Sequence, residues 1–204
     1  MSESIRLQME KRILERPEQT VWVMSDFDDI ASNKTASKTL SRMEETGFLK
    51  KVMQGVFCRL RDGVLPPAHE VASALARSNR HVIVPCGETV LHLMGIKKEK
   101  PEMWTYLTDG GYRTYRYGNI LIEFRHASEK VYASFSQKTA WLVQAVKALG
   151  KEKKDKAMYD SLMGDFSPVE KKTIRAEIRG AAAWIRKTLL QVLDDGSDAL
   201  EENL

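Results

Sequence analysis

The sequence predicts an α+β fold made of two parts, and three features of the chain carry that prediction. Before residue 65, helical patterns are followed by two strand-like runs. From residue 68 to residue 125, helical and strand-like runs alternate, and from Gln137 onward the pattern is helical. The chain has 204 residues, of which 43% are hydrophobic, so it can bury the core of one medium domain or of two small ones.

The first 30 residues predict two helices with a short strand between them. Apolar residues at helical spacing indicate a first helix, which Pro17 ends. Residues 20–24 form a short β-prone run, and Ser25 with Asp28 three positions later is a capping pattern that predicts a short helix through Ile30. The apolar residues of the first helix are Ile5, Met9, Ile13 and Leu14.

A helix and a β-hairpin are predicted next. Ser32 is the expected N-cap of this helix, and Gly47 is a favourable residue just past its end. Two strand-like runs, FLKKV and VFCRL, follow and are joined around residues 53–55. Helix, short helix, turn, helix and hairpin is the order of a winged helix-turn-helix. The apolar face of its second long helix carries Ala36, Leu40 and Met43.

A stiff break at Leu65-Pro66-Pro67 separates the two predicted domains. We expect a winged helix-turn-helix DNA-binding domain over residues 1–64 and a mixed α/β domain over residues 65–204. In the second domain Gly118-Asn119 is a two-residue hairpin signal between two strands. Its alternating helical and strand-like runs are AHEVASALARSN, HVIVP, GETVLHLMG, MWTYLT, YRTYRY and ILIEFR.

The second domain is predicted to end in C-terminal helices and an acidic tail. Ser167-Pro168-Val169-Glu170 is a complete helix start, with a capping serine, proline at the first helical position and glutamate at the third. From Asp194 the chain carries five carboxylates and no basic side chain, a composition that favours disorder. One long helix is predicted between them by the apolar stripe Ile174, Ile178, Ala181, Ile185, Leu189 and Val192.

Charge is segregated within the predicted winged helix. From Ser32 to Arg59 there are six basic and two acidic residues, whereas the first 30 residues carry four basic and seven acidic ones. A helix-turn-helix places its second helix in the major groove, where short polar and basic side chains reach phosphates and base edges. The competing interpretation is an ordinary solvated helix face. The predicted DNA-binding residues are Ser32, Lys34, Thr35, Ser37, Lys38, Ser41, Arg42, Lys50, Lys51 and Gln54.

The rest of the composition narrows the class of protein. The N-terminus is charged throughout, which is unlike a signal peptide, and no apolar run approaches the ~20 residues of a membrane helix. We therefore expect a cytoplasmic protein. Cys58 and Cys86 are too far apart and too isolated for a zinc cluster. No cofactor, metal site or catalytic residue is predicted, and the chain is not expected to be an enzyme.

Arginine and tyrosine alternate along the strand YRTYRY and favour a functional surface in the second domain. Such pairs stack on bases or bind phosphate. The alternative is a twisted hairpin whose tyrosines cover the sheet. The residues of this predicted surface are Arg113, Tyr115, Arg116 and Tyr117.

A metal-dependent nuclease targeted by the winged helix is the alternative function. Asp109 followed by Glu123-Phe124-Arg125 loosely resembles the acidic metal site of restriction-type nucleases. However, arginine replaces the usual lysine, and the glycine-rich turn around Asp109 explains that residue without a metal. A third interpretation is an interaction module whose winged helix never contacts DNA.

Three blocks of the sequence resemble one known family. Residues 13–60, with the segment LSRMEETGFLKKVMQGVF, resemble the winged helix of AbiEi-like antitoxins of AbiE-type (type IV) toxin–antitoxin systems. The blocks AHEVASALARSNRHVIVPCGETVLHLMGI and YLTDGGYRTYRYGNILIEFRHAS are similar to the second domain of that family. The resemblance implies an antitoxin that represses its own operon by binding double-stranded operator DNA. It also implies that the second domain counters a nucleotidyltransferase-like toxin, without requiring a stable complex.

Overall fold

The structure is a computed structural model that describes residues 3–128, 134–150 and 166–201, with the backbone alone for residues 195–201. Its residues pack into two compact units. Unit 1 comprises Met1–Val82 and Tyr115–Ile122, and unit 2 comprises Ile83–Thr114 and Glu123–Leu204. The secondary structure is mixed α and β, as the sequence predicts.

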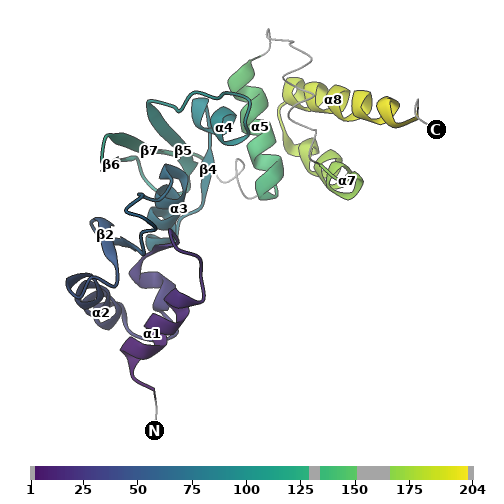
Figure 1. The fold of residues 1–204 in the computed structure, drawn as a ribbon. Coiled ribbons are helices and arrows are strands. Elements are labelled where there is room, and N and C mark those ends of the chain that lie inside the picture. The colour runs from purple at the N-terminus through teal and green to yellow at the C-terminus, as the bar shows by residue number, and fades with distance from the viewer. Residues whose placement is uncertain (1–2, 129–133, 151–165, 202–204) are drawn as a thin grey trace. The chain divides into compact units, whose positions relative to one another are not determined.

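Unit 1 begins with a winged helix-turn-helix (Figure 1). Strand β1 pairs antiparallel with β3, and β3 pairs antiparallel with β2, which gives a three-stranded sheet of order β1-β3-β2. This order of elements confirms the predicted fold of the N-terminal part. The elements are α1 (Ile5–Leu14), β1 (Val21–Trp22), the 3-10 helix η1 (Met24–Phe27), α2 (Asn33–Glu45), β2 (Lys50–Met53) and β3 (Val56–Cys58).

Helical periodicity accounts for the core of the winged helix. Met9 of α1 and Leu40 of α2 are fully buried, and the rings of Trp22 and Phe27 stack with their centroids 5.3 Å apart. Beyond the end of α2, Gly47 has φ of +75°, a conformation that glycine adopts without steric cost. Its position explains why the helix ends there.

The second predicted helix differs from expectation in type and position. It is the 3-10 helix Met24–Phe27, so the expected helix over residues 25–30 is wrong. The carboxylate at its start is Asp26, whose Oδ2 accepts a hydrogen bond from the backbone N–H of Val23 at 2.9 Å. Asp28, the predicted capping residue, forms an ion pair at 3.2 Å with Arg80, which is too distant in the chain for a local pattern to indicate.

Helix α3 (Ala68–Ser78) belongs to unit 1. Arg77 donates hydrogen bonds to Oδ1 of Asp26 at 3.1 Å and to the carbonyl oxygen of Val21 at 3.0 Å. It therefore connects α3 with both η1 and β1. The compact unit that contains the winged helix thus continues beyond residue 64, and a domain boundary at residues 64 and 65 stays a prediction.

The larger sheet has four strands in the order β4-β5-β7-β6. The boundary between the two units passes through β6 and β7. Strands β6 and β7 are joined by a turn at Gly118, which has φ of +57°, as the hairpin signal predicts. The strands are β4 (Ile83–Pro85), β5 (Met103–Thr108), β6 (Arg113–Tyr117) and β7 (Ile120–His126).

The helices of unit 2 share one apolar core. It includes Leu142 and Val146 of α5, Ile178, and Leu189 and Leu193 of α8, all of which are at most 1% exposed. Among the helices of the described residues, none has the combination of length and apolarity needed to cross a membrane. The helices are α4 (Glu88–Leu93), α5 (Gln137–Leu149), α7 (Pro168–Glu177), the 3-10 helix η3 (Ile178–Gly180) and α8 (Ala183–Glu201).

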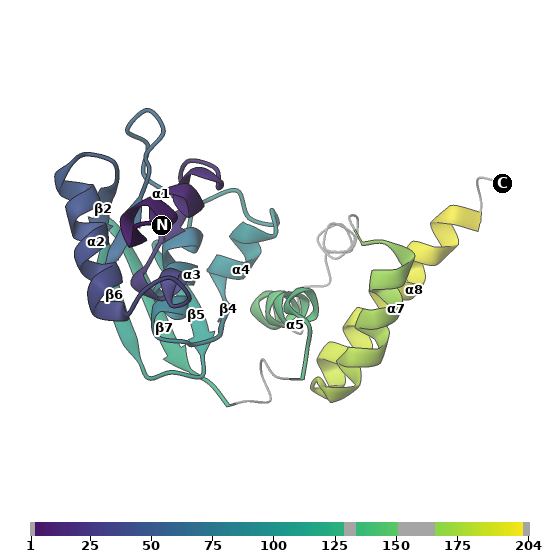
Figure 2. The same cartoon turned by 90° about the horizontal axis from the view of Figure 1, so that it is seen from below.

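The single long C-terminal helix that the apolar stripe predicts is wrong. The backbone of Ala181 is extended (φ −76°, ψ 159°) directly after Gly180, and this separates α7 from α8. The two helices lie side by side (Figure 2), and Arg175 of α7 pairs with Asp194 of α8 at 2.6 Å. Because α8 continues to Glu201, the expectation of a disordered tail is also wrong for residues 194–201.

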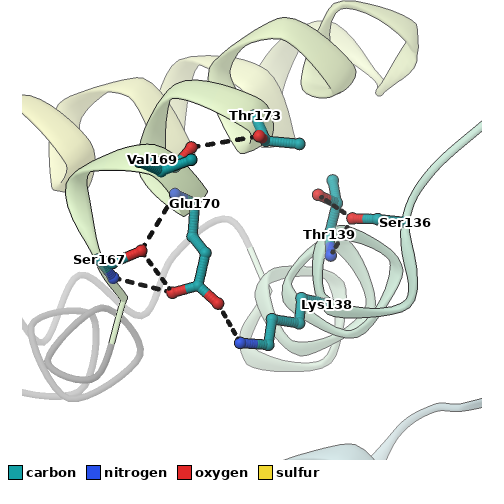
Figure 3. Close-up of polar contacts among 7 residues, drawn as sticks. All are labelled: Ser136, Lys138, Thr139, Ser167, Val169, Glu170 and Thr173. Atoms are coloured by element: carbon teal, nitrogen blue, oxygen red, sulfur yellow. Dashed lines mark hydrogen bonds and ion pairs between the residues drawn. The ribbon is translucent and has the colours of Figure 1, made fainter.

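The start of α7 has the predicted capping box and is bonded to α5 (Figure 3). Ser167 Oγ accepts a hydrogen bond from the backbone N–H of Glu170 at 3.3 Å, and Glu170 Oε2 accepts one from the backbone N–H of Ser167 at 2.9 Å. The other carboxylate oxygen of Glu170 accepts a hydrogen bond from Nζ of Lys138 on α5. This single glutamate therefore both caps α7 and holds it to α5.

Candidate nucleic-acid interface

One face of α2 is exposed and polar along the whole helix. Its residues recur at i, i+3 and i+4, the spacing that aligns side chains on one side of a helix. The opposite face is buried in the core of the winged helix. The polar residues of α2 therefore do not pack in the core, as predicted for a helix with one buried face and one exposed face. The exposed residues of α2 are Asn33, Lys34, Ser37, Lys38, Ser41, Arg42 and Glu45, and the five of them from Lys34 to Arg42 are here called the α2 face.

Two of the predicted DNA-binding residues form the N-cap of α2. Ser32 Oγ accepts a hydrogen bond from the backbone N–H of Thr35 at 3.4 Å, and the two hydroxyl oxygens lie 3.0 Å apart. Ser32 is exposed, whereas Thr35 is half-buried. These residues fix the first turn of the helix, whose end favours an anion such as a phosphate.

Asn33 belongs to the same exposed end of the helix and is not among the predicted DNA-binding residues. It is the first residue of α2 and is exposed. Ser37 and Ser41 follow it at intervals of four residues, which was the signal available in the sequence. A carboxamide both donates and accepts hydrogen bonds and is suited to the edge of adenine in the major groove.

The hairpin β2–β3 carries the remaining predicted residues. Lys50 and Lys51 on β2 are exposed, and Gln54 is exposed in the turn. Gly55, the other turn residue, has φ of +73°. On β3, Phe57 is 5% exposed and packs into the core of the winged helix. The hairpin is thus fixed to the core by β3 and presents basic side chains from β2.

The cations of α2 and β2 differ from most of the other cations of unit 1 in having no ion-pair partner. Unit 1 contains 14 lysines and arginines. Within the described part of unit 1, Lys34, Lys38, Arg42, Lys50 and Lys51 form no ion pair, and the same holds for Arg16 and Arg116. The other seven each lie within 4 Å of a carboxylate: Arg6, Lys11, Arg12, Arg59, Arg61, Arg77 and Arg80.

Arg59 is not one of the unpaired cations, although it is one of the six basic residues between Ser32 and Arg59. Its Nη2 lies 3.3 Å from Oε1 of Glu18, and its guanidinium lies over the ring of Phe48 at 5.8 Å from the centroid. The partner carboxylate is 41 residues away in the chain. The structure therefore reduces the unpaired basic set of this segment to five residues.

The arginine and tyrosine strand β6 lies at the edge of the four-stranded sheet. Arg113 and Arg116 are exposed, and Tyr115 is half-buried. Tyr117 is 3% exposed, and its hydroxyl donates a hydrogen bond to the carbonyl oxygen of Pro66 at 2.8 Å. The assignment of Tyr117 to a contact surface is therefore corrected, because this side chain belongs to the core and to a buried hydrogen bond.

The acidic residues of the alternative nuclease site have protein partners. Glu123 Oε2 lies 2.7 Å from both Nε and Nη2 of Arg125. Asp109 Oδ1 accepts a hydrogen bond from the hydroxyl of Thr108 at 3.3 Å. Among the residues that the structure describes, no group of three or more His, Cys, Asp or Glu side chains is placed to hold a metal ion.

The fold defines a winged helix-turn-helix protein whose second helix has a free, basic face. The chain belongs to a family of unknown function, DUF6088, whose model matches residues 8–172. The match includes the winged helix except the first three residues of α1, and most of the second part of the chain. Comparisons with curated proteins and with solved structures give no match.

Proposed function

We propose that this protein is a cytoplasmic antitoxin that represses its own operon by binding operator DNA through the winged helix. The observation that carries the proposal is the set of five unpaired cations on the α2 face and β2. An unpaired lysine or arginine has not exchanged its hydration for a protein carboxylate, so it remains available to a phosphate. Of the nine other lysines and arginines of unit 1, seven lie within 4 Å of a carboxylate.

The α2 face has the composition that major-groove binding requires. Serine side chains between the lysines allow close approach to the DNA, while the longer basic side chains reach phosphates and base edges. The capped N-terminus of α2 supplies free backbone N–H groups for a further phosphate. Lys50 and Lys51 extend the basic surface from the helix to the hairpin.

Neutralisation of a nucleotidyltransferase-like toxin is the second half of the proposal. It is supported by the resemblance of residues 68–96 and 106–128 to the second domain of AbiEi-like antitoxins. Within that part, Arg113 and Arg116 are the exposed cations of the edge strand β6. We assign them the leading role in the antitoxin surface, with Tyr115 beside them.

The DNA-binding proposal is tested by titrating the full-length protein against its own promoter fragment at several salt concentrations. If all five cations contact phosphates, the slope of log affinity against log salt is about −4.5. Lys38→Ala with Arg42→Ala is expected to weaken binding at least tenfold and to reduce the slope by up to ~2. Lys172→Ala with Arg179→Ala removes two exposed cations from unit 2 and serves as the matched control.

Two results would contradict operator binding by α2. The first is an affinity that does not change with salt. The second is equal affinity for the promoter fragment and for an unrelated duplex of the same length. If the control variant lost as much affinity as the α2 variant, the DNA interface would not be specific to the winged helix.

A further inference from the structure

A small cavity lies wholly within unit 2, at the end of β4. Its volume is about 320 Å³, which is at the lower end of the range for ligand pockets and limits an occupant to a small molecule. Leu107 of β5 and Ala148 of α5 give it apolar walls. Its polar lining comes from four elements or their ends and consists of Cys86, Thr105, Arg125, Gln144 and Lys147.

Gln144 is the buried polar group of this cavity. Its side chain is 5% exposed and makes no hydrogen bond to a described residue. No fully enclosed side-chain nitrogen or oxygen in the described residues lacks a partner, so the Gln144 amide is open to the cavity that it lines. An amide that reaches the cavity can both donate a hydrogen bond to a bound ligand and accept one from it.

Two cations, Lys147 and Arg125, also line the cavity. Lys147 lies one helical turn after Gln144 on α5 and forms no ion pair with a described residue. The carboxylate of Glu123 pairs with Nε and Nη2 of Arg125. Lys147, Arg125 and Glu123 together therefore carry a net charge of +1. Burial raises the pKa of the Cys86 thiol, whereas the charges of Arg125 and Lys147 lower it and Glu123 raises it. The thiol thus lies within the field of these groups.

We propose that this cavity binds a small phosphate monoester of the mononucleotide class. Lys147, Arg125 and the hydroxyl of Thr105 are donors on three different elements, and a phosphate monoester has three terminal oxygens to accept from them. A carboxylate has only two. The amide of Gln144 matches the edge of a nucleobase, which presents a donor and an acceptor side by side. The site is separate from the α2 face and does not depend on DNA binding.

Calorimetric titration of the full-length protein tests the site with three probes: adenosine monophosphate, adenosine and inorganic phosphate. The nucleotide is expected to bind at least tenfold more tightly than either of its parts, since only the nucleotide offers a phosphate to the cations and a base to the Gln144 amide. Gln144→Leu and Lys147→Gln should each weaken nucleotide binding at least tenfold. Lys172→Gln, an exposed lysine on α7 away from the cavity lining, should leave it unchanged.

A second readout uses the two cysteines of the chain. Cys86 is half-buried at the cavity, whereas Cys58 is fully buried in unit 1 and burial raises its pKa to about 11. Bound nucleotide should slow alkylation of Cys86 by iodoacetamide, followed by mass spectrometry, and leave Cys58 unchanged. Protection of Cys86 can also be measured in Lys147→Gln, so the site is still tested if Gln144→Leu does not fold.

Three results would overturn the proposal. One is the absence of nucleotide binding at millimolar concentration with no protection of Cys86. Another is inorganic phosphate that binds as tightly as the nucleotide, since the Gln144 amide would then have no part in binding. The third is equal loss of affinity in Lys147→Gln and Lys172→Gln.

Discussion

At the third position of α7, the carboxylate of Glu170 accepts hydrogen bonds from Ser167 and from Nζ of Lys138 on α5 (Figure 3). The hydrogen bond from Lys138 is the largest of the causes that lower the pKa of Glu170 from 4.5 to about 2. A carboxylate with a lowered pKa in the folded state stabilises the fold above its unfolded pKa. That stabilisation is lost as the pH falls from about 4.5 towards 2.

Glu170→Gln is therefore expected to lower the thermal unfolding midpoint at pH 7 and to have little effect near pH 2. The difference between the two proteins should shrink as the pH falls through this interval, because the wild-type carboxylate becomes protonated. Thermal unfolding followed by circular dichroism at a series of pH values measures it. Glu102→Gln, at an exposed glutamate without an ion pair in the described residues, should show no such trend. A difference that stays constant with pH would exclude the ionic contact as its cause.

Tyr117 is the residue whose role the structure changes most. Burial raises the pKa of its hydroxyl to about 12, and that hydroxyl bonds the carbonyl oxygen of Pro66. Tyr117→Phe should lower the free energy of unfolding by about 1–2 kcal/mol, because the carbonyl loses its partner in a buried place. Urea unfolding measures the change. Tyr112→Phe, at a side chain that is 73% exposed, should leave it within experimental error.

At the scale of elements, the sequence predicts the helices and strands whose ends are set by residues close to them in the chain. Helix α2 has a capping serine, a buried face and a terminal glycine within 16 residues, and it forms as predicted. Helix η1 and the break between α7 and α8 were not predicted. Asp26 is bonded by Arg77, 51 residues away, and Arg175 bonds Asp194 across the break. Apolar residues at helical spacing occur both on one long helix and on two helices that pack together, so periodicity alone does not predict the break between α7 and α8.

Arg77 carries the connection of α3 to the winged helix, and its removal tests that connection. Arg77→Ala loses hydrogen bonds to the Asp26 carboxylate and to the Val21 carbonyl. Because the side chain is 45% exposed, we expect a loss of about 1–2 kcal/mol in the free energy of unfolding, below the value of a fully buried charged pair. Urea unfolding checks it, with Arg16→Ala, an arginine without an ion pair in the described residues, as the control. Equal effects of the two substitutions would rule out a specific role for Arg77.

At the scale of the whole chain, the sequence predicts surfaces that lie on one helix and misses those that depend on distant partners. The α2 face follows from helical spacing alone, and so it could be named in advance. Arg59 is not an unpaired cation because it pairs with Glu18, and Tyr117 is not a surface residue because its hydroxyl bonds the carbonyl oxygen of Pro66. The cavity with Gln144 combines residues from β5, β7 and α5 with the end of β4, and none of these segments shows a binding motif by itself.

The proposed division of labour between the α2 face and β6 predicts opposite effects for two double variants. Lys38→Ala with Arg42→Ala should abolish repression, since two contacts at ~1–3 kcal/mol each weaken operator binding by orders of magnitude. Both side chains are exposed, so the fold and toxin neutralisation should be retained. Arg113→Ala with Arg116→Ala should impair neutralisation and leave repression intact. Reporter expression from the promoter and growth under toxin induction measure both. Loss of neutralisation in the α2 variant would show instead that antitoxin activity depends on DNA binding, and the two functions would not be separable along the chain.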